Sequence, residues 1–404
     1  MGTFFLVIIY LAFISLGLPD SLLGVAWPVM HLEINAPLEA AGLISMIVAG
    51  GTIISSLASG TILKYLGTGK VTFISCLMTA SALLGFSLAP SLAWFALLAI
   101  PLGLGAGSVD AGLNNYVATH YKARHMSWLH CFWGVGATVG PMIMSGFILK
   151  ENYWRGGYLT VASIQFMLVI LLFLTLPLWD KVIKQTNSNF DNSAVNENTQ
   201  NSLLENKEVK VVKPMQIKGV KIALISFLFY CGTELTLGLW GSSYLVNIKG
   251  LPAATAAQWV AMYYGGITIG RFLTGFLTIK ISNPMLIRLG QIMAFIGAIF
   301  LLLPLLSSFS LFGFILIGLG CAPIYPCMLH ETPKRFGKEN SQMLMGYQMA
   351  FAYIGSTFLP PFLGWLAARL TIGILPIFLL MYILIMLIGA EILNIYQKNI
   401  LFQK

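Results

Sequence analysis

The sequence predicts an all-α membrane protein with 12 transmembrane helices in two pseudo-symmetric six-helix halves. Its composition, its number of apolar segments and an internal repeat predict this class. Only 9% of the 404 residues are charged and 57% are hydrophobic, whereas a soluble domain has about 25% charged residues. The chain therefore lacks the polar cover that a water-facing surface needs, which excludes a cytosolic enzyme, a nucleic-acid-binding protein and a disordered protein.

A helix needs about 20 mainly apolar residues to cross the hydrocarbon core of a bilayer. Polar residues, prolines and glycines divide the chain into segments of this length. They lie at roughly 4–30, 39–63, 71–89, 92–118, 127–149, 157–179, 220–247, 254–279, 285–305, 308–329, 341–368 and 371–395. The first has no basic n-region and no A-x-A cleavage pattern, so we expect a retained helix.

The basic residues predict the orientation. If both termini are cytoplasmic, 18 of the 23 Lys and Arg residues fall in cytoplasmic loops or tails, four lie outside and one lies within a span. This split follows the positive-inside rule, so the net charge of +9 is a topology marker. The polar segment 180–219 is expected to be a flexible cytoplasmic linker between an N-terminal half (1–179) and a C-terminal half (220–404).

The two halves align with each other at an offset of about 215 residues. The matched pairs are Asp20-x3-Gly24 with Glu234-x3-Gly238, Gly60–Lys64 with Gly275–Lys280, Gly103-Leu-Gly105 with Gly318-Leu-Gly320, and Gly136–Pro141 with Gly355–Pro360. Many secondary transporters are built from two related halves, with the solute site between them near the bilayer midplane.

The chain resembles major facilitator superfamily transporters, and most of all the fucose–galactose–glucose:proton symporter family. The segments that carry the resemblance are Gly17-Leu-Pro-Asp20…Trp27-Pro28, Gly103-Leu-Gly-Ala-Gly-Ser-Val-Asp110…Asn114-Asn115-Tyr116 and Tyr230-Cys-Gly-Thr-Glu234…Trp240. In that family, an acid on span 1 and another on span 4 are implicated in proton coupling, which implies this role for Asp20 and Asp110.

The chain departs from the pattern in three places, one of which is Asp110, where the fucose porter has a glutamate. Lys64 stands where the superfamily's loop 2–3 signature has an aspartate, and Asn115 follows Asn114 where the fucose porter has a proline. The resemblance therefore does not identify the substrate.

Eleven of the 14 acidic residues lie in loops or near helix ends, and the exceptions are Asp20, Asp110 and Glu234. A charge at the centre of a membrane helix costs about 2.5–3.5 kcal/mol on insertion scales, so such residues are seldom there without a use. A carboxylate that is neutral when occupied and charged when empty is what proton coupling requires. The alternative is an acid satisfied by a buried partner, and Arg271 is the expected ion-pair partner of Glu234.

Several side chains are candidate solute contacts. Asn114 lies one helical turn after Asp110, so both are expected to line one cavity, and an amide can both donate to and accept from a polyhydroxylated solute. The other candidates are Asn115, Trp27, His130, Trp133, Trp240, Tyr244 and Gln348. The alternatives are a packing role for His130 and interfacial anchoring for the aromatic residues.

We expect a secondary active transporter that couples a proton, or sodium, to the uptake of a sugar or similar small polar solute by alternating access. Efflux of an amphiphilic drug or metabolite is the alternative, because Gly136-x3-Gly140-Pro141 resembles an antiporter motif. A non-transporting sensor ranks lower.

The sequence predicts no enzyme, cofactor or metal site, since the five cysteines lack zinc-site spacing. We expect a monomer in a bacterial inner (plasma) membrane.

Overall fold

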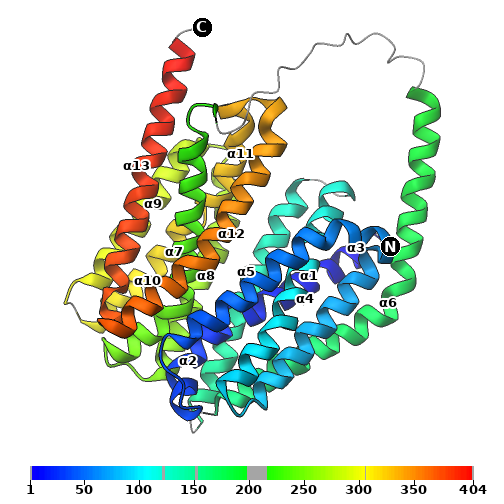
Figure 1. Cartoon of the computed structure of the whole chain (residues 1–404). Helices are drawn as coiled ribbons and strands as arrows, with labels where there is room; N and C mark the ends of the chain where they lie inside the picture. The colour runs from blue at the N-terminus through cyan, green and yellow to red at the C-terminus, as the bar shows by residue number, and fades with distance from the viewer. Residues whose placement is uncertain (1, 121–122, 151–152, 198–215, 305, 403–404) are drawn as a thin grey trace.

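The computed structural model describes residues 2–120, 123–150, 153–197, 216–304 and 306–402. The elements are α1 (Gly2–Asp20), α2 (Leu22–Glu33), α3 (Ala40–Ser87), α4 (Leu92–His120), α5 (Ala123–Ile148), α6 (Trp154–Glu197), α7 (Val220–Asn247), α8 (Ala253–Leu277), α9 (Asn283–Leu302), α10 (Ser307–Cys321), α11 (Ile324–Phe336), α12 (Lys338–Arg369), the 3-10 helix η2 (Ile372–Ile374) and α13 (Leu375–Phe402). Figure 1 shows their arrangement.

Interruptions in the helices fall at residues that disfavour regular helix. The first predicted span is divided into α1 and α2 at Ser21, which follows Pro19 and has φ −100° and ψ −12°. The tenth is divided into α10 and α11 around Pro323. The second and third spans are both in α3, and they meet at Gly67, whose φ of 76° is a conformation that glycine adopts without steric cost.

All 12 predicted spans are helical, and the predicted all-α membrane class is confirmed. Within the described ranges, 10 stretches are long and apolar enough to cross a membrane. That number treats α3, which contains two predicted spans, as one stretch, and it leaves out α8. Helix is the form expected here, because every backbone N–H and C=O group must be bonded within the segment once water is absent.

The repeated glycines make equivalent contacts in the two halves. Six of them, in three matched pairs, lie where two helices approach so closely that an added Cβ would meet backbone atoms of the neighbour, as small residues in membrane helices allow, whereas Gly60 and Gly275 face open space. The equivalent pairs are Gly103 on Val48 and Gly318 on Tyr263; Gly105 on Ser75 and Gly320 on Gly290; and Gly136 on Ile14 and Gly355 on Leu228. The internal repeat therefore corresponds to a repeated packing scheme.

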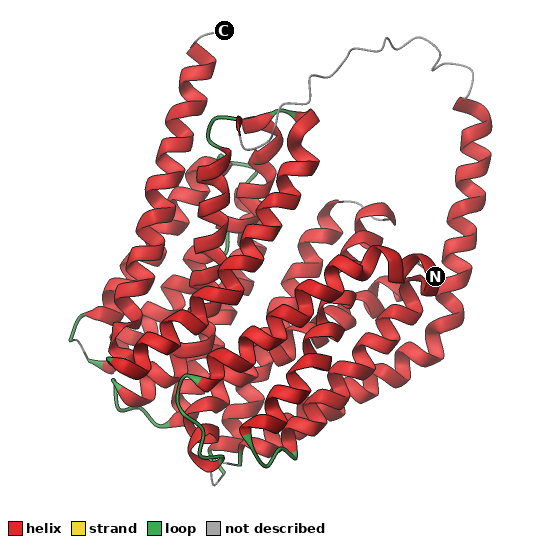
Figure 2. Ribbon diagram, viewed as in Figure 1, coloured by secondary structure: helices red, strands yellow, loops and turns green. Residues whose placement is uncertain are grey.

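Each half packs as a bundle of its own, and the two bundles meet along a limited set of helices. Helix α3 packs against α4 and α6, and α1 against α5; in the other half, α7 packs against α12 and α13, and α9 against α10. The halves contact each other through α2 with α7, α5 with α8, and α3 with α12. Figure 2 shows that the bundles diverge toward the end that carries the C-terminus.

The outer surface of the bundles is apolar. Leu57, Met167 and Phe276 have exposed fractions of 82%, 71% and 60%. Such exposure suits a surface that faces lipid tails rather than water. Helix α6 continues to Glu197 and so enters the segment for which the sequence predicts a flexible linker. Residues 198–215 of that segment lie outside the described residues.

Candidate functional site

Asp20 is the last residue of α1, immediately before the interruption at Ser21. Its side chain is exposed, so water reaches a carboxylate that lies within the first membrane span. The indole Nε1–H of Trp133, on α5, donates a hydrogen bond to Asp20 Oδ2 at 2.8 Å. Trp133 therefore holds the carboxylate of the residue that the sequence predicted as a proton site.

Glu234 and Arg271 form a buried ion pair inside the C-terminal half. Arg271 Nη2, on α8, lies 3.3 Å from Glu234 Oε1, on α7, and the two side chains are only 14% and 9% exposed. The same nitrogen donates to the hydroxyl of Tyr230, one turn before Glu234, at 3.3 Å. Because two opposite charges and a hydroxyl satisfy one another, both ions tolerate removal from water.

Asp110 lies in the middle of α4 and accepts a hydrogen bond from Asn114 Nδ2 at 2.9 Å. The two residues are one helical turn apart and share a face, as their spacing predicts. The amide oxygen of Asn114 is buried and has no hydrogen-bond partner among the described residues. A buried acceptor of this kind can receive a hydrogen bond from a solute hydroxyl. The side chain of Asn115 lies outside the described residues.

The three carboxylates, although far apart in the sequence, are close in space. The charges of both Asp110 and Glu234 act on Asp20. Helices α1 and α4 of one half and α7 of the other thus bring three acids together, and α8 adds the guanidinium of Arg271. No ion pair joins Asp20 or Asp110 to a cation in the part of the chain that the structure describes.

Trp133 lies between the two halves. While its N–H binds Asp20 in the N-terminal half, its ring lies 5.3 Å from the guanidinium carbon of Arg271 and 6.3 Å from the ring of Tyr264, both on α8. His130, one turn earlier on α5, is partly buried, and its ring lies edge-on to Phe13 at 5.9 Å. The charge of Arg271 also acts on His130.

Tyrosines complete the site, and most were not singled out from the sequence. Tyr263 donates to the backbone carbonyl of Glu234 at 3.0 Å. Tyr325, at the start of α11, and Tyr353, on α12, both feel the charge of Asp110, and Tyr353 also hydrogen bonds Ser56 of α3. Helical spacing could have identified some, since Tyr230 precedes Glu234 by four residues and Tyr264 precedes Arg271 by seven.

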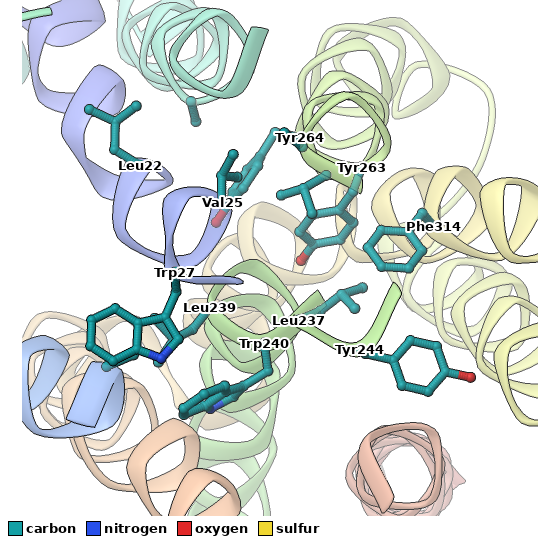
Figure 3. Packing of buried hydrophobic residues seen from close by; sticks show 14 of the residues in the cluster. Leu22, Val25, Trp27, Leu237, Leu239, Trp240, Tyr244, Tyr263, Tyr264 and Phe314 are labelled. Atoms are coloured by element: carbon teal, nitrogen blue, oxygen red, sulfur yellow. The ribbon is translucent and has the colours of Figure 1, made fainter. Parts of the chain in front are cut away.

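Four predicted solute contacts have polar atoms that form hydrogen bonds within the protein. Trp27 is fully buried and donates to Leu38 O at 2.8 Å. Figure 3 shows it near Trp240, while Tyr244 lies farther along α7. Three other polar groups have hydrogen-bond partners within the protein. Trp240 Nε1 donates to Pro360 O, and the Tyr244 hydroxyl donates to Leu301 O. Gln348 Oε1 accepts from Thr332 Oγ1. These atoms therefore already have partners within the protein.

Titratable side chains do not form a metal site here. Within the described ranges, no group of three or more His, Cys, Asp or Glu residues is arranged to hold a metal ion. The cysteines are free thiols.

A family model described as Major Facilitator Superfamily matches residues 9–360 and, in a second match, residues 222–396. The chain belongs to the Major Facilitator Superfamily. It is therefore a multi-pass membrane transporter protein and not an enzyme. The second match, confined to the C-terminal half, agrees with the internal repeat.

Several members of the superfamily are similar in sequence. "Bypass of stop codon protein 6" of Saccharomyces cerevisiae is 28% identical over 325 residues, which cover 74% of this chain and 63% of that protein. The glucose/mannose transporter GlcP of Bacillus subtilis is 24% identical, with 66% and 64% covered, and a glucose/galactose transporter of Brucella abortus is 22% identical, with 66% and 63% covered. The matches span less than two thirds of the length of these relatives.

Known structures of superfamily members share the fold. The crystal structure of a D-xylose–proton symporter has a TM-score of 0.70 at 14% identity and covers 96% of both chains. That of a peptide transporter, POT, in complex with sulfate has a TM-score of 0.74 at 13% identity, covering 97% of this chain and 94% of its own.

The superfamily's loop 2–3 signature keeps its glycine but not its aspartate in this chain. Gly67 makes the turn within α3 with a positive φ, and open space surrounds the position where a Cβ would project. Lys64 occupies the place of the aspartate. Gly69, two residues later, packs directly against the Trp179 ring of α6. In this member of the superfamily, glycine geometry and aromatic packing therefore shape the loop.

Proposed function

We propose that the protein is a secondary active transporter that couples proton entry to the import of a neutral sugar or a similar small polar solute. The observation that carries the proposal is the meeting of Asp20, Asp110 and Glu234 beside Arg271, on helices of both halves. Intramembrane ionisable residues are costly, and in transporters they mark proton relays and solute pathways.

The chemistry around the acids favours a neutral polar solute. Tyrosine and tryptophan supply flat apolar faces with a polar edge, and Asn114 has an unpaired buried acceptor. A single cation, Arg271, already compensated by Glu234, offers little attraction to an anionic solute. The glucose transporters among the relatives support a sugar.

Proton coupling requires an acid whose charge is not permanently compensated. Asp20 and Asp110 meet this requirement, because the described structure gives them a neutral indole and a neutral amide as partners. Glu234 is paired with Arg271. We therefore assign proton binding to Asp20 and Asp110, and the organisation of the solute site to the Glu234–Arg271 pair.

Basic residues and inter-half contacts together support an inward-open state in the inner (plasma) membrane with cytoplasmic termini. The loops with most basic residues lie at the end where the bundles diverge (Figure 1). At the other end the halves touch: Ser145 Oγ donates to Ala254 O, and Ser242 Oγ donates to Val25 O. Water would then reach Asp20 from the cytoplasm.

The antiporter-like glycines have a packing role. An added Cβ on Gly136 or Gly140 would meet the backbone carbonyl of Ile14 or Leu18 in α1. Close approach of α1 and α5 therefore accounts for the motif that favours efflux.

Uptake by proteoliposomes tests the proposal. An inward proton gradient is expected to stimulate uptake of radiolabelled glucose, galactose or another sugar, and Asp110→Asn is expected to remove the stimulation. Glu39→Gln is the matched control, because Glu39 is an acid in the turn before α3, outside the three-acid site. Equal gradient-driven uptake by Asp110→Asn would refute the role of Asp110. Hypersensitivity of a deletion strain to hydrophobic toxins would favour efflux instead.

A further inference from the structure

Trp133 contacts an acid of one half and a cation of the other. Its N–H donates to Asp20 Oδ2 at 2.8 Å, and Arg271 lies over its ring at 5.3 Å. This separation is within the range of a cation–π interaction. The indole thus connects Asp20 physically to the Glu234–Arg271 pair. In the described structure no direct ion pair joins Asp20 to Arg271.

The strength of this connection depends on the charge of Asp20. A hydrogen bond to an ionised acceptor is shorter and roughly twice as strong as one between neutral groups. Hydrogen-bonded groups in a medium of low dielectric also polarise one another. An ionised Asp20 therefore makes the indole ring more electron-rich, which strengthens its attraction for the guanidinium. Protonation of Asp20 weakens both interactions.

The surrounding packing holds Trp133 against α1 of its own half and places it beside the contact of α5 with α8 of the other half. An added Cβ on Gly17, one turn before Asp20, would meet the backbone carbonyl of Trp133, so α1 and α5 are held in close contact. Gly134, the next residue, faces the side chain of Thr268 on α8. The α5–α8 contact is between halves, so it must change when the halves move relative to each other.

We propose that Trp133 is a positioning residue that transmits the charge of Asp20 to Arg271, so that an ionised Asp20 holds α8 against α5 and a neutral Asp20 releases it. The inference rests on the proposed function, and it adds a route by which a proton bound in the N-terminal half changes the C-terminal half. Other groups also face this network. They are Asp110 on α4, His130 on α5, Glu234 and Tyr230 on α7, and Tyr264 on α8.

The test measures conformation rather than transport. Spin labels at Tyr65→Cys and Ile279→Cys would report the separation of the diverging ends, because both positions are highly exposed, at 81% and 80%. They are introduced into a variant without native cysteines. We expect the distance distribution to differ between acidic and alkaline pH, and Asp20→Asn to abolish the difference.

Trp133→Phe keeps an aromatic ring but removes the N–H donor, so it separates the hydrogen bond from simple packing. We expect it to abolish the pH-dependent shift and to lower gradient-driven uptake about tenfold. Adding Asp20→Asn to Trp133→Phe should cause no further change in the distance distribution, because coupled residues act as one unit. Trp94→Phe, at an exposed position on α4, is the control.

A pH-dependent distance shift in Trp133→Phe equal to that of the parent protein would overturn the inference. So would additive effects of Trp133→Phe and Asp20→Asn on the distance distribution, or a distance distribution of the parent protein that does not change with pH. If the shift depends on Trp133 but no solute is driven by a proton gradient, the proposed function fails while the Asp20–Trp133–Arg271 connection stands.

Discussion

Gly24 of α2 lies where the backbones of the two halves approach closely, and its substitution makes a quantitative prediction. A Cβ added there would meet the carbonyl oxygen of Gly238, and would lie 2.6 Å from Leu239 O and 2.7 Å from Leu239 Cα. Ordinary van der Waals contact begins at 3.4 Å. Since all three atoms belong to the backbone, no side chain can turn away, and α2 and α7 must separate by about 1 Å.

Overpacking of this kind typically costs about 1–3 kcal/mol. The contact joins the two halves, so the cost falls on conformations in which these ends are closed and not on those in which they are apart. We therefore expect Gly24→Val to shift the equilibrium toward the opposite, outward-open arrangement by about 5- to 150-fold.

Labelling of a buried position at the same interface measures the shift. Ser242 is fully buried, and its Oγ lies 3.5 Å from Val25 O across the halves. We expect a membrane-impermeant maleimide to modify Ser242→Cys at least about tenfold faster when Gly24→Val is also present. Gly146→Val is the matched control, because open space surrounds Gly146 on α5. An unchanged labelling rate in a folded Gly24→Val protein would show that this contact does not close the outer end.

Two further predictions concern ion pairs. Arg271→Gln or Glu234→Gln alone leaves a buried charge without its partner. Each should therefore lower the melting temperature of the purified protein by an amount equivalent to about 3–5 kcal/mol, and the double substitution should recover much of this loss. A double variant as unstable as the sum of the two single variants would contradict the pairing. Arg155 binds Glu33 and the backbone carbonyls of Ser87 and Ala89 in the N-terminal half. Arg155→Met should therefore lower the free energy of unfolding, measured by thermal unfolding, by about 1–3 kcal/mol. A change within experimental error would mean that these contacts give no net stabilisation.

The sequence predicts the helices and their repeat because both depend on local composition. Apolar length determines the spans, and most of the repeated glycines mark helix crossings. Gly103 and Gly318, matched from sequence alone, each pack on the helix of the second or eighth span. What spacing does not specify is the rotation of one helix about its axis relative to another, and this rotation decides that Trp133 meets Asp20.

Trp27 shows how a spacing argument fails. Seven residues after Asp20, it would share that residue's face if the first span were one regular helix. The helix is interrupted at Ser21, and Trp27 turns to donate its N–H to Leu38 O. Tyr325 is the converse case, a site residue that the sequence did not predict. It lies between Pro323 and Pro326 at the break in the tenth span, and this position brings it close to Asp110, although nothing in the local sequence indicates that neighbour.

The internal repeat also bears on the different roles that we propose for the two equivalent acids. Asp20-x3-Gly24 and Glu234-x3-Gly238 occupy matching positions, and their glycines meet across the halves while their acids lie one turn deeper. The alignment that pairs Gly60 with Gly275 places Ser56 opposite Arg271. Ser56 donates to Gly107 O and carries no charge. The cation that compensates Glu234 therefore has no counterpart at the matching position of the N-terminal half, and on this ground we propose that Asp20, rather than Glu234, exchanges the proton. Placing an arginine at this position restores the missing symmetry, so Ser56→Arg should abolish proton-driven uptake yet preserve solute binding; a variant that still accumulates solute in response to a proton gradient would refute this division of roles.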